Sequence, residues 1–111
     1  MTKIYPYVFN NTITVSDNSV IQNQYTWESR GVYELGIIEE WLKNIKSDST
    51  VLDIGAQSGS YTLSAKFYPE SKWYSFEPDP DNYKLLLENL KLNDINNVIT
   101  SPEALSNKVG D

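Results

Sequence analysis

The residues best suited to chemistry lie in one short loop, residues 55–59, whose sequence is Gly-Ala-Gln-Ser-Gly. The loop directly follows an apolar run that ends at Ile54. Gly55 permits a sharp turn and lets a ligand approach the backbone closely. Gly59 stands where the next helix is expected to begin, so a side chain there would push that helix away from the sheet. The N–H groups and positive dipole of a helix N-terminus suit a carboxylate, so the loop is a candidate site for an anionic group.

Two acidic residues complete the candidate site. Glu77 follows Gly55 by 22 residues and ends a second apolar run, which we expect to be a strand. In nucleotide-binding α/β folds, an acidic residue at this position holds a ribose diol. Asp53 lies at the end of the first strand, where its carboxylate can face an ammonium group. Neighbouring strand ends lie about 4.8 Å apart, so the loop and Glu77 share one crevice. S-adenosylmethionine carries a ribose, a carboxylate and an ammonium group, and these residues predict it as the cofactor.

Several other ligands and chemistries are disfavoured. Dinucleotide-binding turns have the pattern G-x-G-x-x-G, and Gln57 stands in place of the middle glycine; the Gly-Lys-Ser/Thr phosphate loop is absent too. The chain has no Cys and no His, which excludes thiol catalysis, disulfides, zinc sites of the Cys or His type and a His general base. The acidic residues show no clustering that predicts a metal site. No catalytic base is predicted.

The elements around the loop alternate in type. We expect a strand at 50–54, a helix at 60–68 closed by Pro69, a strand at 73–76, a helix that starts at Pro80 with Asp79 as its N-cap, and a strand at 98–101. This order predicts one half of a doubly wound α/β sheet. Right-handed crossovers give the spatial strand order 3-2-1.

The segment before this alternation has a different pattern. Residues 1–24 alternate and turn as expected of a small β-hairpin or cap. Residues 32–46 have the spacing of an amphipathic helix, with Lys43 and Lys46 in its last turn. We therefore expect two parts, an N-terminal β cap at 1–29 and a cofactor-binding half-domain at 30–111.

Two motifs resemble those of FkbM-type methyltransferases. Residues 51–63 (VLDIGAQSGSYTL) are similar to the first motif of that family, and residues 74–83 (YSFEPDPDNY) to the second. Residues 86–97 and 103–106 continue the match, so the resemblance covers about residues 30–111. Gln57 replaces the Asn usual in that family. The resemblance implies a Rossmann-like methyltransferase fold, truncated after the third strand.

The resemblance also implies a function and roles for residues. The reaction would be S-adenosylmethionine-dependent methylation, usually of oxygen, with a small-molecule acceptor such as a sugar hydroxyl. Glu77 would hold the ribose and Glu103 would lie near the adenine. Members are about twice this length, which implies a fragment or a split gene product, so we expect no turnover by the chain alone. The predicted cofactor-binding residues are Asp53, Gly55, Ala56, Gln57, Gly59, Glu77, Pro78 and Glu103.

Composition sets expectations about partners. The net charge is −6 and the nine Lys and Arg are scattered, so we expect no nucleic-acid partner. The sequence shows no membrane-spanning run and no signal peptide, from which we expect no membrane association and a cytoplasmic location. The strand at 51–54 would expose one edge, so we expect self-association or a partner chain that completes the sheet.

Two other functions compete with this interpretation. One is a fragment of a nicotinamide-dependent oxidoreductase, which Gln57 disfavours. The other is a non-catalytic module that binds a nucleoside or a protein. Individual residues also have plainer explanations: Glu77 as a solvated strand end, and Asp53 as a partner for loop N–H groups.

Overall fold

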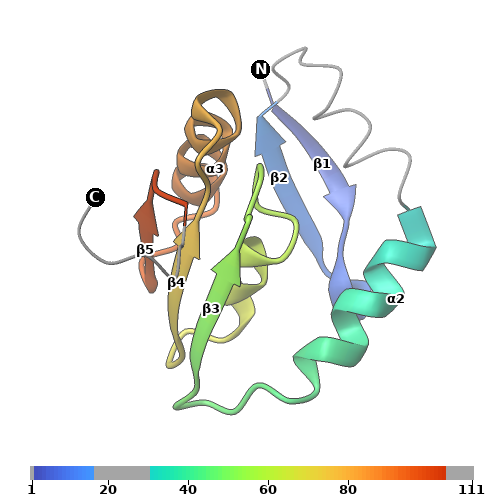
Figure 1. Cartoon of the computed structure of the whole chain (residues 1–111). Coiled ribbons are helices and arrows are strands. Elements are labelled where there is room, and N and C mark those ends of the chain that lie inside the picture. Colours follow the sequence, from blue (N-terminus) through green and yellow to red (C-terminus); the bar gives the residue numbers. More distant parts are fainter. Residues whose placement is uncertain (1, 17–30, 105–111) are drawn as a thin grey trace.

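The computed structural model describes residues 2–16 and 31–104 (Figure 1). Strands β1 (Thr2–Pro6) and β2 (Thr12–Ser16) flank a 3-10 turn, η1 (Val8–Asn10). Helix α2 (Gly31–Leu42) comes next. The remaining elements are β3 (Thr50–Ile54), a 3-10 helix η3 (Thr62–Phe67), β4 (Lys72–Phe76), α3 (Pro80–Leu92) and β5 (Val98–Ser101). No helix within these described ranges is long and apolar enough to cross a bilayer.

Strands β3, β4 and β5 form the parallel sheet that the sequence predicts. β4 lies in the middle, with Val51 opposite Trp73 and Trp73 opposite Val98. The first, second and third predicted strands are β3, β4 and β5, and they lie side by side in that order, which is the expected 3-2-1 arrangement. Parallel strands place their carboxyl ends at one edge of the sheet, which brings the loop after β3 beside Glu77.

The two faces of this sheet differ in burial. On the inner face Val51, Trp73 and Ser75 are buried. On the opposite face, here called the outer sheet face, Leu52, Ile54 and Ile99 are 58%, 62% and 51% exposed. Because side chains alternate along a strand, one face packs on helices while the other shows apolar side chains to solvent.

Helix α3 forms as the sequence predicts. The Asp79 carboxylate accepts a hydrogen bond from the Asn82 backbone N–H at 3.1 Å, and Pro80 occupies the first turn. Leu86 and Leu90 are buried on one face of the helix. The N-cap and this face fix the helix against the inner face of the sheet.

Two helix predictions need correction. The segment predicted as a helix at 60–68 is a shorter 3-10 helix that begins only at Thr62, because turns continue from the loop through Tyr61. The helix predicted at 32–46 ends at Leu42. There, the Asn44 side chain donates to the Trp41 carbonyl, and the Lys46 N–H donates to the Ser49 hydroxyl. Lys43 and Lys46 therefore follow the helix and do not form its last turn.

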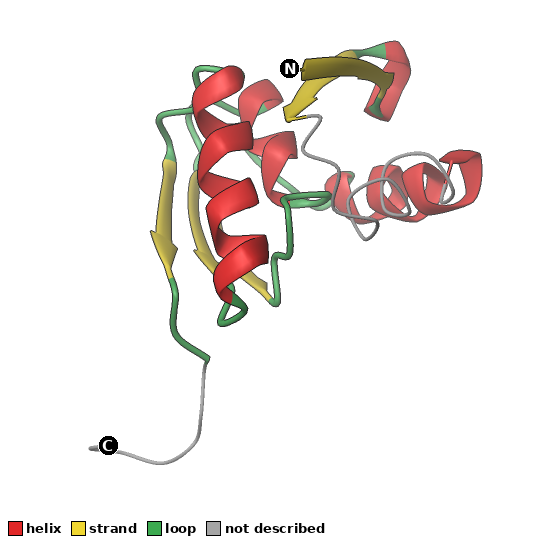
Figure 2. Ribbon diagram, turned by 90° about the horizontal axis from the view of Figure 1, so that it is seen from above, coloured by secondary structure: helices red, strands yellow, loops and turns green. Residues whose placement is uncertain are grey.

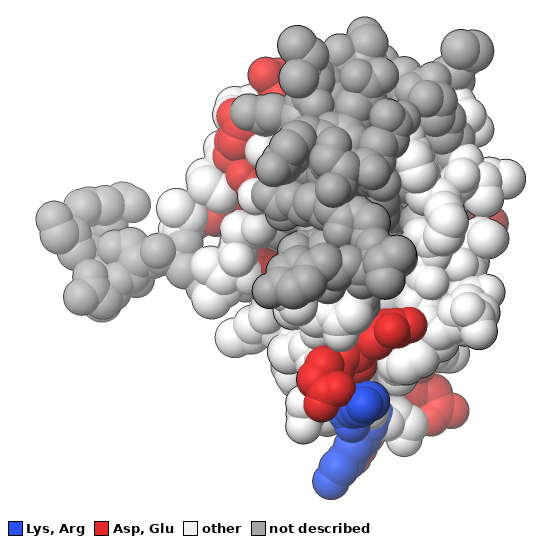
Figure 3. Space-filling view, turned by 90° about the vertical axis from the view of Figure 1, so that its right-hand side faces the viewer, with Lys and Arg blue, Asp and Glu red and all other residues white. Residues whose placement is uncertain are grey.

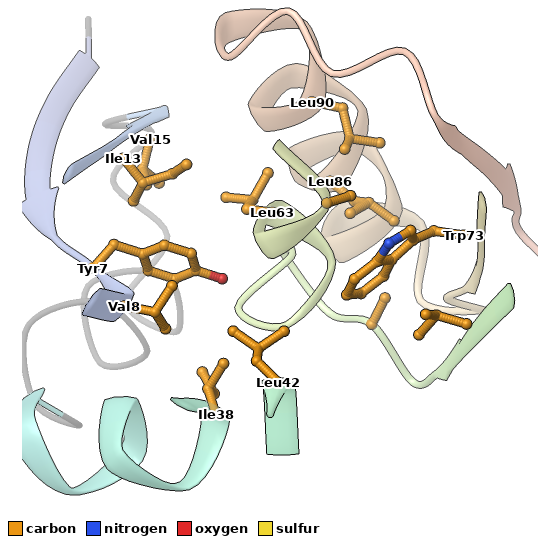
Figure 4. Close-up of a cluster of buried hydrophobic side chains, with 13 residues drawn as sticks. Tyr7, Val8, Ile13, Val15, Ile38, Leu42, Leu63, Trp73, Leu86 and Leu90 are labelled. Atoms are coloured by element: carbon orange, nitrogen blue, oxygen red, sulfur yellow. The ribbon is translucent and has the colours of Figure 1, made fainter. Parts of the chain in front are cut away.

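The N-terminal hairpin forms and packs on the rest of the molecule. β1 pairs with β2 in antiparallel fashion, and Figure 2 shows the hairpin as a unit separate from the parallel sheet. Its buried residues Tyr7, Val8 and Ile13 join one core with Leu63 and Leu86 (Figure 4). Residues 17–24 of the predicted cap lie outside the described residues, as does the predicted boundary at 29/30.

Candidate functional site

Backbone hydrogen bonds tie together the carboxyl ends of the three parallel strands. The N–H groups of Gly55 and Ala56 both donate to the Phe76 carbonyl, at 2.8 and 3.0 Å. The Glu77 N–H donates to the Ser101 carbonyl at 3.0 Å. The loop after β3, Glu77 after β4 and the segment after β5 therefore share one edge of the sheet.

The loop backbone adopts a left-handed conformation at three positions. The φ angles are +77° at Gly55, +54° at Gln57 and +113° at Gly59. A Cβ at Gly55 would meet no atom within 4 Å, whereas one at Gly59 would lie 3.2 Å from side-chain carbons of both Leu63 and Leu86. Gly59 thus permits close packing of the loop on η3 and α3, and Gly55 leaves open space beside the backbone.

Glu77 is a buried carboxylate that holds the loop in place. Only 5% of the residue is exposed. One oxygen accepts the Gln57 N–H at 2.7 Å, and the other accepts the Asp79 N–H at 2.9 Å. Glu77 is therefore not a solvated strand end. A carboxylate has about four acceptor positions, so each oxygen keeps a lone pair for a further donor such as a ribose hydroxyl.

Asp53 points to the inner face of the sheet and bonds to η3. Its carboxylate accepts from the Thr62 hydroxyl at 2.5 Å, and that hydroxyl lies 2.7 Å from the Ser75 hydroxyl. Burial and the nearby charge of Glu77 raise the pKa of Asp53, and the Thr62 hydrogen bond partly offsets them. Within the described ranges, no Lys forms an ion pair with either carboxylate. A cationic ligand would relieve this local excess of negative charge.

The other predicted residues lie at the same edge of the sheet, and all of them except Ala56 are exposed. Pro78 and Glu103 are exposed, and the Glu103 N–H donates to the Ser101 hydroxyl at 3.2 Å. Gln57 is exposed as well, while Ala56 is buried in the core. The adenine role of Glu103 and the ribose role of Glu77 stay predictions.

Sequence reasoning missed two residues that donate hydrogen bonds to backbone carbonyls of the loop and of Ser60, which follows it. The Asn89 side-chain amide donates to the Ser58 carbonyl at 2.8 Å, and the Tyr7 hydroxyl donates to the Ser60 carbonyl at 2.5 Å. Asn89 did leave a signal: it is a polar residue between Leu86 and Leu90, on the apolar face of α3. Tyr7 left none, because its partner is 53 residues away in the chain.

The described cations are few on the face seen in Figure 3. Blue atoms gather in one place on it, beside red ones. Among the described residues, Lys43 pairs with Glu40 at 2.9 Å.

Comparison with known proteins places the chain among methyltransferases. The model of the TRM5/TYW2 methyltransferase domain matches residues 31–110. The methyltransferase sdnD of Sordaria araneosa is 41% identical over 54 residues, which is 48% of this chain and 21% of that protein. The chain thus spans about a fifth of the length of that relative.

Solved structures share the fold at low sequence identity. The structure of P. horikoshii TYW2 in complex with MeSAdo matches 93% of this chain and 36% of its own, with a TM-score of 0.64 and 20% identity. M. jannaschii TYW2 in complex with AdoMet matches 89% of this chain and 42% of its own, with a TM-score of 0.62 and 23% identity. These matches confirm the Rossmann-like α/β fold predicted from the sequence.

One expectation about partners is wrong. The sparse, scattered cations led to the prediction that nucleic acid is not a partner. Yet the TRM5/TYW2 methyltransferase model matches most of the chain, and the fold is shared with the complex of aTrm5 and tRNALeu, which matches 91% of this chain and 28% of its own with a TM-score of 0.58 and 21% identity. Net charge is a weak guide to such partners because it counts cations over a whole chain, whereas phosphate contacts depend on a few local cations.

The family model extends over the α2 helix, the parallel sheet, the glycine loop and the acidic strand ends, close to three quarters of the chain. The methyltransferase part of the sequence-based resemblance is thereby confirmed, whereas the FkbM type stays a prediction. The chain belongs to the TRM5/TYW2 methyltransferase domain family.

Proposed function

We propose that this chain binds S-adenosylmethionine at the carboxyl edge of β3, β4 and β5 and forms the cofactor-binding part of a methyltransferase. The observation that carries the proposal is the buried junction between Glu77 and the loop, where a carboxylate at the end of β4 holds the Gln57 N–H at 2.7 Å. Family membership supports it, as do the similar folds of TYW2 proteins in complex with AdoMet or MeSAdo.

The residues at this edge fit the groups of that cofactor. Open space beside Gly55 leaves room for a ligand against the backbone. The remaining lone pairs of Glu77 suit a vicinal diol, and the Asp53 carboxylate suits a cation. When bound, the cofactor supplies an electrophilic methyl group on a sulfonium. The chain's own contribution is to bind and orient it, which is a large part of catalysis in group transfer.

The expected division of the chain becomes a proposal as well. We propose that residues 30–111 carry the cofactor site and that residues 1–29 form an N-terminal cap that supports it. The shared core of Tyr7, Val8 and Ile13 with Leu63 and Leu86 supports this arrangement.

Two classes of methyl acceptor have separate support. Membership of the TRM5/TYW2 family and the fold shared with the aTrm5–tRNALeu complex favour a tRNA nucleotide. The FkbM-like motifs favour a hydroxyl of a sugar or small metabolite. This chain spans 36–42% of the TYW2 structures. The identity of the methyl acceptor is therefore a proposal about the whole methyltransferase and not about this cofactor-binding part alone.

Calorimetric titration tests the cofactor assignment. We expect S-adenosylhomocysteine to bind the 111-residue chain and NAD not to bind. Glu70→Ala is the matched control for substitutions of the acidic site residues, because Glu70 is an exposed acid outside the site. Its affinity for S-adenosylhomocysteine should equal that of the unsubstituted chain. Binding of NAD alone would favour the oxidoreductase alternative, and binding of neither ligand would refute the assignment.

Fluorescence anisotropy separates the two acceptor classes. A labelled tRNA should bind with an affinity that falls steeply as salt rises if phosphate contacts contribute. No change in anisotropy at low salt would leave the small-molecule hydroxyl as the favoured acceptor, to be tested by methyl transfer to a panel of sugars with the complete protein.

A further inference from the structure

We propose that Tyr7 and Asn89 are positioning residues through which the N-terminal hairpin sets the shape of the cofactor loop. The inference rests on the proposed function, and it extends the site to a part of the chain outside the family match at residues 31–110.

Two carbonyl groups, one in the loop and one at Ser60 directly after it, have partners from distant parts of the chain. Asn89 on α3 donates to the Ser58 carbonyl at 2.8 Å, and Tyr7 in the hairpin donates to the Ser60 carbonyl at 2.5 Å. Asn89 is fully buried and Tyr7 is nearly so. The bond to Ser58 is buried and the bond to Ser60 is partly buried. A carbonyl removed from water without a partner is costly, so both bonds favour one conformation of this backbone.

Asn89 connects the loop to the hairpin as well as to α3. Its side-chain oxygen accepts the Ser16 N–H of β2 at 2.8 Å. One turn further along α3, Asn93 accepts the Thr14 N–H at 3.1 Å and donates to the Thr14 carbonyl at 2.7 Å. Two asparagines thus bind the edge of β2 in the way that a neighbouring strand would, and one of them also holds the loop.

Tyr7 reaches the loop from the other end of the hairpin. In Figure 4 its hydroxyl points away from the hairpin toward the segment that contains Leu63. The Tyr7 hydroxyl also lies 2.8 Å from the Ser64 hydroxyl. Burial raises the pKa of Tyr7, so it keeps its proton and can donate to Ser60 while accepting from Ser64.

The loop needs such support because its conformation is unfavourable in isolation. Gln57 is a non-glycine residue with φ of +54°, which L-residues adopt at some cost. The hydrogen bond from the Gln57 N–H to Glu77, and the bonds that the following Ser58 and Ser60 carbonyls accept from Asn89 and Tyr7, offset that cost. A loop held in its binding shape before the ligand arrives binds more tightly.

Two matched pairs of variants test the proposal in the 111-residue chain, with affinity for S-adenosylhomocysteine measured at temperatures where every variant is folded. Asn89→Leu and Asn93→Leu both remove bonds to β2, but only Asn89 touches the loop. Tyr7→Phe removes one hydroxyl, and Val8→Ala destabilises the same hairpin without a bond to the loop. We expect Tyr7→Phe and Asn89→Leu to weaken binding roughly tenfold, and Val8→Ala and Asn93→Leu to change it less than about twofold.

Hydrogen exchange at the Gln57 amide gives a second readout that needs no ligand. It should accelerate in Tyr7→Phe and Asn89→Leu relative to the β4 amides, and not in the two control variants. Equal affinity losses within each pair, or unchanged exchange at Gln57, would overturn the proposal. If the unsubstituted chain binds no S-adenosylhomocysteine, the proposed function fails, and exchange alone then decides whether the hairpin shapes the loop. If Tyr7→Phe does not fold, the asparagine pair decides.

Discussion

At the scale of single residues, Glu77 combines a structural role with the proposed role in binding. Its two oxygens hold the Gln57 and Asp79 N–H groups, and its remaining lone pairs are proposed to hold the ribose. We expect Glu77→Ala to weaken S-adenosylhomocysteine binding by about 1.5–3 kcal/mol, the usual worth of charge-assisted hydrogen bonds. Isothermal titration of the folded variant measures this loss.

Asp79→Ala is the comparison for Glu77→Ala. It removes the N-cap bond to Asn82, which should lower the free energy of unfolding by about 1 kcal/mol and leave affinity nearly unchanged. Equal losses of affinity in the two variants would contradict the binding role of Glu77.

Substitution of Asp53 should change the stability of the chain and its affinity for the cofactor in opposite directions. Its pKa lies above the ordinary 3.8 because burial and Glu77 disfavour the charged form. The unfolded chain therefore releases this proton at lower pH than the folded chain does. The free energy of unfolding falls as pH rises from about 3.8 through the raised pKa of Asp53 in the folded chain. Asp53→Asn should raise the melting temperature at pH 7, and the gain should disappear below about pH 3.8.

The same substitution should weaken binding of S-adenosylmethionine. An amide keeps an acceptor for Thr62 but loses the charge that is proposed to attract the cationic ligand. For the unsubstituted chain, affinity should fall as pH is lowered through the raised pKa of Asp53, and this dependence should be absent in Asp53→Asn. Thermal melts and titrations at a series of pH values measure both effects. A lower melting temperature for Asp53→Asn at pH 7 would contradict the argument.

At the scale of elements, the loop predicts a difference between its two glycines. Gly59→Ala adds a methyl group 3.2 Å from carbons of Leu63 and Leu86, at a φ of +113°. We expect a loss of about 2–3 kcal/mol in unfolding free energy from strain and overpacking. Gly55→Ala meets open space, so it should cost only the backbone strain, about 1–2 kcal/mol. Denaturant unfolding measures both, and the reverse order would contradict this packing.

The sequence predicted the elements whose signals are local. Asp79 and Pro80 mark the start of α3, and the apolar runs mark β3 and β5, because caps and burial patterns act over a few residues. The 3-10 form of η3 was not predictable in this way. Its Thr62 and Ser64 hydroxyls bond to Asp53 and Tyr7, and such tertiary contacts override local helix preference.

In the candidate site too, local patterns predicted some residues, and contacts with distant parts of the chain hid the others. Asp53, the loop and Glu77 were expected to meet because parallel strands end at one edge of a sheet. Asn89 and Tyr7 were missed because their loop partners lie 31 and 53 residues away. A pattern within a short window can mark Asn89 as a polar residue on an apolar helix face, but it does not identify a partner at that separation.

At the scale of the whole molecule, the parallel sheet is open at β3. Among the described strands, β3 pairs with β4 alone. Its edge continues into the apolar outer sheet face, where Leu52 and Ile54 are exposed. We expect a second copy of the chain to pair here, so that light scattering gives a mass above 12.7 kDa as concentration rises.

A charge placed on this edge should reduce the self-association. Leu52→Lys adds a cation to β3, and Leu87→Lys is the control because Leu87 is an exposed leucine on α3. Only Leu52→Lys should restore the monomer mass. A monomer at all concentrations in the unsubstituted chain would contradict the prediction.

The outer sheet face also governs how the folded protein responds to fluorescent dyes that bind apolar surface. Such dyes usually report loosely packed states, but here the native protein already shows Leu52, Ile54 and Ile99 to water on one flat face. The dye signal should therefore be high before any denaturant is added and should fall as β3, β4 and β5 separate. A bright dye signal before denaturant is added would thus report the native sheet and not misfolding.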